Sequence, residues 1–150
     1  TRLRVPVECK ELAEVVAREH GNIHRSGEFS AAAIVRLLER CDAFRKPARF
    51  AEVLLACECD ALGRLGFENT AYPQRQRLLQ SLQAAQTVTA ENAINNIAVK
   101  AVNTPARGEN NSKKEINEAV EAKTPSGKQI GEMMHAARVK AVQTRLQDFR

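Results

Sequence analysis

The sequence contains no tryptophan, and aromatic residues make up only 4% of its 150 positions. Leucine, valine, isoleucine and alanine must therefore supply the core, which favours packed helices. No apolar run approaches the roughly 20 residues that would span a bilayer, and the start, TRLRVPVECK, lacks the apolar segment of a secretory signal. These absences predict a soluble, cytoplasmic chain with no membrane partner. The first residue is Thr rather than Met, which suggests a piece of a longer protein.

Cysteine is sparse and scattered. The four cysteines include one close pair, Cys57 and Cys59, which lie two positions apart in a stretch with helical spacing and so point to different faces. This is not the spacing of a zinc-binding motif. We expect all four to be reduced thiols, mostly packed, as is usual in a cytosolic chain.

Basic residues outnumber acidic ones. The chain has 23 Lys and Arg against 18 Asp and Glu, which gives a formal net charge of +5 and a pI near 9.3. Such a balance favours contact with a polyanion such as nucleic acid, although a solvated basic surface would give the same count. The length is that of one typical domain.

Apolar residues recur with helical spacing in six stretches, and no stretch alternates with period two. Capping residues or prolines mark where these stretches start: Pro6, Ser30, Pro47, Pro73, Thr89 and Ser126. Gly21 suits the end of the first helix, the glycines at 63 and 66 suit the end of the third, and the fifth ends before Pro105. The pattern predicts an all-α fold, a bundle of about six or seven helices.

Residues 103–128 differ in character, with two prolines, two glycines, many charges and only Ile116 and Val120 as large aliphatics. We expect a mobile insertion with one short helix there. Ser126 and Gln129 then form the pattern of a capping box, and a last amphipathic helix follows. Its apolar face holds Ile130, Met133, Met134, Ala137 and Ala141.

Two histidines four positions apart, His20 and His24, would share one helical face if the first helix continued through Gly21. Two imidazoles at that spacing can bind one metal ion, but a metal site needs three or more ligands. The other interpretation is a feature of the helix end, because a histidine near a helix C-terminus interacts favourably with the helix dipole. The residues alone leave both interpretations open.

Asp60 and Arg64 lie one helical turn apart, which allows either an ion pair or a ligand contact beside the glycines that follow. Upstream, basic residues cluster densely enough to meet phosphates, although a solvated face is the alternative. With Arg64 they form the candidate phosphate-binding set: Arg36, Arg40, Arg45, Lys46, Arg49 and Arg64. The chain has no phosphate-binding loop, nucleophile elbow or paired nucleotidyl-transfer carboxylates, so we predict no catalytic residue in it.

Five motifs, taken in this order, resemble one known family. They are HGNIH, LLERCDAFRKPARF, CDALGRLGFE, YPQ and GKQIGEMMHAARVKAV. In combination they are similar to the C-terminal part of the bacterial CCA-adding enzymes, the tRNA nucleotidyltransferases of the multifunctional type. The resemblance covers residues 1–91 and 125–150, whereas residues 92–124 depart from it.

The resemblance implies an enzyme whose N-terminal head adds C, C and A to the 3′ end of tRNA from CTP and ATP, at two metal-bound carboxylates. It also implies an appended HD-family phosphohydrolase domain with phosphatase and cyclic-nucleotide phosphodiesterase activity, which uses magnesium or nickel. The head and the first His-Asp pair of the HD family would lie upstream of Thr1. This chain would then be inactive alone and would need no cofactor by itself.

On this resemblance the chain has three parts. Residues 1–91 form a helical tail and part of an HD-type domain. Residues 92–124 form a divergent and partly mobile insertion, and residues 125–150 form the C-terminal amphipathic helix.

The resemblance also implies roles for individual residues. His20 falls where the family has a second His-Asp pair, although Gly21 replaces the aspartate. Asp60 resembles the late aspartate of HD metal sites, so His20 and Asp60 are the implied metal ligands. The phosphate-binding set is implied to bind tRNA.

A different class of function is also compatible with the sequence, namely a helical interaction module without a catalytic role. It would form a homodimer or dock a partner through the face of Met133 and Met134. Salt-dependent binding of tRNA would separate the two hypotheses, because phosphate contacts release counterions.

Overall fold

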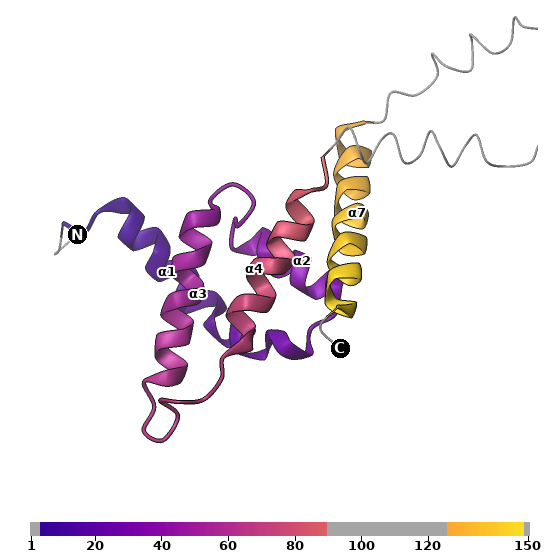
Figure 1. The fold of residues 1–150 in the computed structure, drawn as a ribbon. Helices are drawn as coiled ribbons and strands as arrows, with labels where there is room; N and C mark the ends of the chain where they lie inside the picture. The colour runs from indigo at the N-terminus through magenta and orange to yellow at the C-terminus, as the bar shows by residue number, and fades with distance from the viewer. Residues whose placement is uncertain (1–3, 90–125, 149–150) are drawn as a thin grey trace, which may run out of the picture. The chain divides into compact units, whose positions relative to one another are not determined.

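The computed structural model describes residues 4–89 and 126–148. In these two ranges the chain forms five α-helices and one short 3₁₀-helix, η1, and contains no β-strand, which confirms the predicted all-α class (Figure 1). The elements are α1 (Val7–His24), η1 (Arg25–Glu28), α2 (Ala31–Arg40), α3 (Pro47–Leu62), α4 (Pro73–Gln86) and α7 (Gly127–Gln147). None of the helices described is long and apolar enough to cross a membrane.

Two predicted helices fall almost wholly outside the described residues. They are the helix expected from Thr89 to before Pro105 and the short helix expected within 103–128. The predicted count of six or seven helices therefore refers to a longer range than the structure describes.

The chain divides into two compact units, one of Thr1–Thr87 with Arg138–Arg150 and the other of Val88–Ala137. Helix α7 crosses this division, and its residues from Arg138 onward belong to the first unit. The first unit contains α1 to α4 and every residue predicted to bind metal or RNA. It is therefore the unit that holds the candidate site.

The starts of α2, α3 and α4 follow local signals in the sequence. The Ser30 side chain accepts a hydrogen bond from the Ala33 backbone N–H at 3.3 Å and so caps α2. Pro47 and Pro73 occupy the first turns of α3 and α4, where the missing N–H would have no helical partner. All three predicted starts are confirmed.

Helix α7 begins with the predicted capping box. The Ser126 backbone N–H donates to Gln129 Oε1 at 2.9 Å, and the Gln129 N–H donates to Ser126 Oγ at 3.4 Å. Farther along, in the first unit, Val142 is fully buried. The Arg138 guanidinium lies 4.1 Å from the centroid of the Phe44 ring, a cation–π contact. The last part of α7 therefore packs on the core of that unit.

Helix α1 does not end at Gly21, so that prediction is wrong. The helix continues to His24. Ile23 is fully buried and Glu19 is 2% exposed, so packing on both sides of Gly21 holds the helix through it. A glycine inside a helix costs only about 1 kcal/mol relative to alanine, which the burial of one isoleucine outweighs.

The core of the first unit is aliphatic, as the scarcity of aromatic residues predicted. Among the described residues, Phe50 is the one aromatic side chain that is fully buried. The aliphatic members come from every helix of the unit: Ile23, Ile34, Val35, Leu37, Leu38, Val53, Leu54, Leu78 and Val142. Of the stripe predicted for the third helix, Ala61 alone is half-buried, and Phe50, Val53, Leu54 and Cys57 are fully buried.

Helices α1 and α3 run in the same direction. Near the start of α1, Glu11 contacts Lys46 and Arg49 at the start of α3. At the end of α1, His24 contacts Asp60 near the end of α3. Polar pairs 35 to 38 residues apart in the sequence therefore fasten the two helices at both ends.

Helix α3 ends at the first of the two glycines predicted to stop it, and a loop leads from there to α4. Gly63 caps α3, and Gly66 has a φ of +88°, a conformation that glycine alone adopts readily. A hydrogen bond from the Phe67 N–H to the Arg64 carbonyl at 2.9 Å orders the loop. It projects at the lower end of α3 and α4 in Figure 1 and returns the chain to the end of α1.

Candidate functional site

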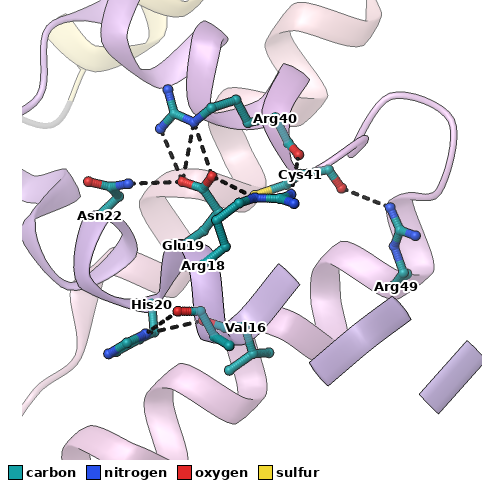
Figure 2. Close-up of polar contacts among 9 residues, drawn as sticks. Val16, Arg18, Glu19, His20, Asn22, Arg40, Cys41 and Arg49 are labelled. Atoms are coloured by element: carbon teal, nitrogen blue, oxygen red, sulfur yellow. Dashed lines mark hydrogen bonds and ion pairs between the residues drawn. The ribbon is translucent and has the colours of Figure 1, made fainter. Parts of the chain in front are cut away.

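Glu19 is a buried carboxylate at the centre of a polar network. Its side chain is 2% exposed, and the side chain of Arg40, at the end of α2, reaches it (Figure 2). Arg40 Nε donates to both carboxylate oxygens, at 3.1 and 3.3 Å, and Arg40 Nη2 donates to Oε2 at 3.1 Å. Bidentate contacts between an arginine and a carboxylate are strong and directional. Arg40 therefore holds the end of α2 against α1.

Two neighbours complete this Glu19 network. Asn22 Nδ2 donates to Glu19 Oε2 at 2.9 Å, and Arg18 Nε donates to Glu19 Oε1 at 3.2 Å. Arg18 Nη2 also donates to the Arg40 backbone carbonyl at 2.9 Å. Burial alone would raise the pKa of Glu19, but the hydrogen bonds and charge of Arg40, with the bonds from Asn22 and Arg18, lower it below its usual 4.5. Glu19 is therefore ionised at neutral pH.

A second network, the Glu11 network, fastens the start of α3 to α1. Lys46 Nζ and Arg49 Nη1 both donate to Glu11 Oε2, at 2.6 and 2.8 Å. The hydrogen bond and charge of Lys46, followed by those of Arg49, lower the pKa of Glu11. Arg49 Nη2 donates to the Cys41 backbone carbonyl at 3.1 Å and lies 3.6 Å from Asp42 Oδ2. Arg49 therefore joins three segments of the chain.

Five of the six predicted RNA-binding residues form ion pairs with acidic side chains of the same unit. Arg40 belongs to the Glu19 network, Lys46 and Arg49 belong to the Glu11 network, Arg45 pairs with Asp42 at 3.8 Å, and Arg64 pairs with Asp60 at 3.7 Å.

The six cations differ in exposure. The side chain of Arg49 is 14% exposed, whereas those of Arg45 and Arg64 are 80% and 66% exposed. Arg36 is exposed and forms no ion pair within the part of the chain that the structure describes. The predicted set therefore divides into cations that hold the fold and an exposed group, Arg36, Arg45 and Arg64, that faces solvent.

His24 is the centre of a third group, the His24 cluster, which consists of His24, Asp60 and Tyr72. The His24 Nε2 atom lies 3.2 Å from Asp60 Oδ2 on α3, and the Tyr72 hydroxyl lies 2.9 Å from His24 Nδ1. The His24 and Tyr72 rings pack edge to face with centroids 5.8 Å apart. Gln74 Nε2 on α4 also donates to the His24 backbone carbonyl at 3.2 Å. Contacts from α3, α4 and the residue before α4 thus meet at the last residue of α1.

His20 lies one turn before His24 on the same face of α1. The two ring centroids are 6.1 Å apart and the rings are nearly perpendicular, at 84°. The His20 Nδ1 atom lies 3.2 Å from the backbone carbonyl oxygens of both Val16 and Ala17, so its partner is its own helix (Figure 2). No hydrogen bond or ion pair joins His20 to Asp60 among the residues described.

The predicted metal ligands, His20 and Asp60, do not fit a metal site as they stand. Asp60 Oδ2 already contacts His24 and Arg64, and Gly21 supplies no carboxylate. Within residues 4–89 and 126–148, no three His, Cys, Asp or Glu side chains are grouped to hold a metal ion, whereas zinc sites in proteins have at least three protein ligands. The magnesium or nickel that the resemblance implies has no complete site in this part of the chain. The assignment of the two residues as ligands stays a prediction.

Tyr72 and the two buried thiols remain protonated over the physiological range. Burial, with smaller effects from the neighbouring acidic groups, raises the pKa of Tyr72 to about 12. Burial likewise raises the pKa of Cys41 to about 12 and that of Cys57 to about 11. All four cysteines are free thiols, as predicted. Two of them, Cys9 and Cys59, are exposed rather than packed. The Tyr72 hydroxyl can therefore donate a hydrogen bond to His24. Neither buried thiol serves as a nucleophile, because both stay protonated.

Sequence reasoning missed the acidic partners of the basic cluster. Glu19 lies midway between Val15 and Ile23 at the four-residue spacing of the buried face of α1, and an acid in such a position needs a cation. That spacing could have pointed to Glu19. Glu11 and Tyr72 carried no comparable signal, because their partners lie more than 30 residues away in the sequence.

Curated relatives resemble the chain over most of its length. A "Multifunctional CCA protein" of Polaromonas naphthalenivorans (strain CJ2) is 62% identical over 141 residues, which is 94% of this chain and 28% of that protein. Another of the same name, from Paracidovorax citrulli (strain AAC00-1), is 60% identical over 142 residues, 95% of this chain and 28% of that protein. One from Cupriavidus necator is 73% identical over 89 residues, 59% of this chain and 22% of that protein. The chain thus spans 28% of the length of the first two.

The Polaromonas match leaves nine residues of the chain unmatched, so it extends into residues 92–124. No protein-family model matches the chain, and no solved structure matches it.

Proposed function

Because this similarity identifies the chain as a segment of the multifunctional CCA protein family, we propose that it is a helical accessory part of a cytoplasmic tRNA nucleotidyltransferase. In this proposal the chain holds tRNA, and a head outside the chain adds CCA to the tRNA 3′ end. CTP, ATP and magnesium are then bound by that head. The observation that carries the proposal is identity of 60% or more along nearly the whole chain.

The exposed cations support the tRNA-binding part of the proposal. Arg36, Arg45 and Arg64 face solvent on a chain with a net charge of +5. Arg40 and Lys46 are 46% and 42% exposed and can add to the positive potential while they hold the fold. Aromatic side chains for base stacking are scarce, so the contacts are to phosphates rather than bases.

The phosphohydrolase activity that the resemblance implies has a separate place in the proposal. The first unit supplies part of an HD-type helical domain, and the activity, with magnesium or nickel, requires residues beyond this chain. His20 and Asp60 offer no complete metal site by themselves within the described residues. We therefore assign no step of that reaction to the chain alone.

Binding of unmodified tRNA transcript to the 150-residue chain tests the proposal. The affinity is measured by filter binding between 50 and 200 mM salt, which is the range where phosphate contacts change affinity steeply. The triple variant Arg36→Ala/Arg45→Ala/Arg64→Ala should bind more weakly and should lower the slope of log K against log salt by about one for each phosphate that is no longer neutralised. Lys10→Ala, which removes an exposed cation paired with Glu14 on α1, is the matched control.

Two results would decide against the proposal. An unchanged slope in the triple variant would show that these three residues are only solvated surface. Incorporation of labelled ATP into tRNA lacking its 3′ end by the chain alone would contradict the placement of CCA addition outside it.

A further inference from the structure

One imidazole in the first unit is shared by three segments of the chain. His24 ends α1, Asp60 lies on α3, and Tyr72 directly precedes α4. Gln74 on α4 adds a hydrogen bond to the His24 backbone carbonyl. These contacts bring together residues 36, 48 and 50 positions apart in the sequence. The position of the His24 ring is therefore set by tertiary contacts rather than by its own helix.

The hydrogen-bonding partners determine which nitrogen of His24 carries the proton. The Asp60 carboxylate accepts only, so Nε2 must donate to it as N–H. Nδ1 of the neutral ring then has a lone pair, and the Tyr72 hydroxyl donates to it at 2.9 Å. The hydrogen bonds therefore run from Tyr72 through His24 to Asp60, and both ring nitrogens of His24 are used.

His20 has the opposite tautomer. Its Nδ1 lies 3.2 Å from two backbone carbonyl oxygens, which accept only, so Nδ1 carries the proton. The lone pair of His20 is then on Nε2. Of the four ring nitrogens in the two histidines, His20 Nε2 alone has a lone pair that no partner occupies in the described part of the chain.

Joint metal binding by the two histidines would need a lone pair from each ring. The centroid distance of 6.1 Å brings the rings near enough to act together, but His24 can ligate only after it breaks its bond to Asp60 or to Tyr72. We propose that the His24 cluster is a hydrogen-bonded clasp that joins α1, α3 and the start of α4 and withholds His24 from metal. The clasp stands where the resemblance places metal ligands, and Asp60 opposes metal binding there rather than supporting it. This proposal is independent of tRNA binding.

The tautomers provide a direct test on the unaltered chain. Nitrogen-15 NMR of the imidazole rings, recorded above pH 7 without added metal, should show His24 protonated at Nε2 and His20 protonated at Nδ1. The Nε2-protonated form for both rings, or rapid exchange between forms at His24, would overturn the clasp.

Nickel titration tests whether the clasp withholds His24 from metal. NiCl2 is titrated into the tag-free chain by calorimetry, and Asp60→Ala is compared with the wild type. The clasp predicts that Asp60→Ala binds Ni²⁺ at least severalfold more tightly, because His24 Nε2 becomes available beside His20. The double variant Asp60→Ala/His20→Ala should lose that gain. If Asp60 were a ligand, its removal would weaken binding, and either weaker or unchanged affinity would overturn the proposal.

Thermal unfolding tests whether the clasp stabilises the packing of α1, α3 and the start of α4. Tyr72→Phe and Asp60→Asn should each lower the Tm of the chain, and in a His24→Ala background neither should lower it further. Glu14→Gln, on the exposed face of α1, serves as the control and should leave the Tm unchanged. Full lowering by Tyr72→Phe in the His24→Ala background would show that Tyr72 acts through packing and would remove it from the clasp.

Discussion

The Glu19 carboxylate on α1 accepts three hydrogen bonds from the guanidinium of Arg40 at the end of α2, at 3.1 to 3.3 Å. Glu19 is 2% exposed, whereas Arg40 is 46% exposed. A cation that the sequence pattern assigned to RNA is therefore also the partner of a buried carboxylate. Removing Arg40 would take these three hydrogen bonds away from the buried carboxylate and leave Arg18 as its one cationic partner among the described residues.

We expect Arg40→Ala to lower the free energy of unfolding by about 3 kcal/mol, near the lower end of the range for breaking a buried ion pair. The lower end applies because Arg18 and Asn22 still contact Glu19. Urea unfolding at pH 7 measures the effect. Arg36→Ala, on the same helix without an ion pair among the described residues, should change the free energy by no more than about 0.5 kcal/mol. Equal effects of the two substitutions would contradict the structural role of Arg40.

Glu19 should also make the stability depend on acid pH. Its pKa is lower in the folded chain than the usual 4.5, so its contribution is fully present above that value and is lost as the pH falls through the folded pKa. Unfolding free energies measured from pH 7 to pH 3 should therefore decline below pH 4.5 in the wild type. Glu19→Gln should decline less steeply, whereas Glu14→Gln, at an exposed position, should follow the wild-type slope. If the unfolding free energies of wild type and Glu19→Gln declined in parallel, ionised Glu19 would not be a source of the stability lost in acid.

Local signals in the sequence predicted the helices well. Ser30, Pro47 and Pro73 mark the observed starts because a cap or a fixed φ acts within one turn. Gly21 does not end α1, because the free energy that a glycine costs inside a helix is small and the burial of Ile23 outweighs it. Weak local preferences therefore mislead wherever tertiary packing is strong.

The polar networks could not be read from the sequence in the same way. The basic cluster was visible as a run of charges, but Glu11 pairs with Lys46 across 35 residues and Glu19 pairs with Arg40 across 21. These partners meet only after the helices have packed. His24 was noticed for its spacing from His20, whereas its contact with Asp60 follows from the common direction of α1 and α3. The sequence therefore indicated the basic residues and the two histidines, but neither their pairing nor their partners Glu11, Glu19 and Tyr72.

The cysteines should fall into two classes of reactivity. Cys9 and Cys59 are exposed, whereas Cys41 and Cys57 are buried, and burial raises their pKa values to about 12 and about 11. An aromatic disulfide reagent at pH 8 should therefore modify two thiols rapidly in the native chain and all four in denaturant. Cys9→Ser/Cys59→Ser should show almost no rapid phase. Rapid modification of a third thiol in the native chain would show that the core opens near α2 or α3.

The continuation of α1 through Gly21 predicts a stabilising substitution. A Cβ built on Gly21 meets no atom within 4 Å, and its φ is not positive. Gly21→Ala should therefore raise the free energy of unfolding by about 0.5–1 kcal/mol, the helix-interior difference between the two residues. Two matched substitutions should act in the opposite direction. In Gly63→Ala the new Cβ lies 2.9 Å from the Cys59 carbonyl oxygen, and in Gly66→Ala it is placed on a residue with a φ of +88°. Urea unfolding should therefore show a higher free energy of unfolding for Gly21→Ala and lower values for the other two variants. A loss of stability in Gly21→Ala would mean that α1 ends before His24 in solution.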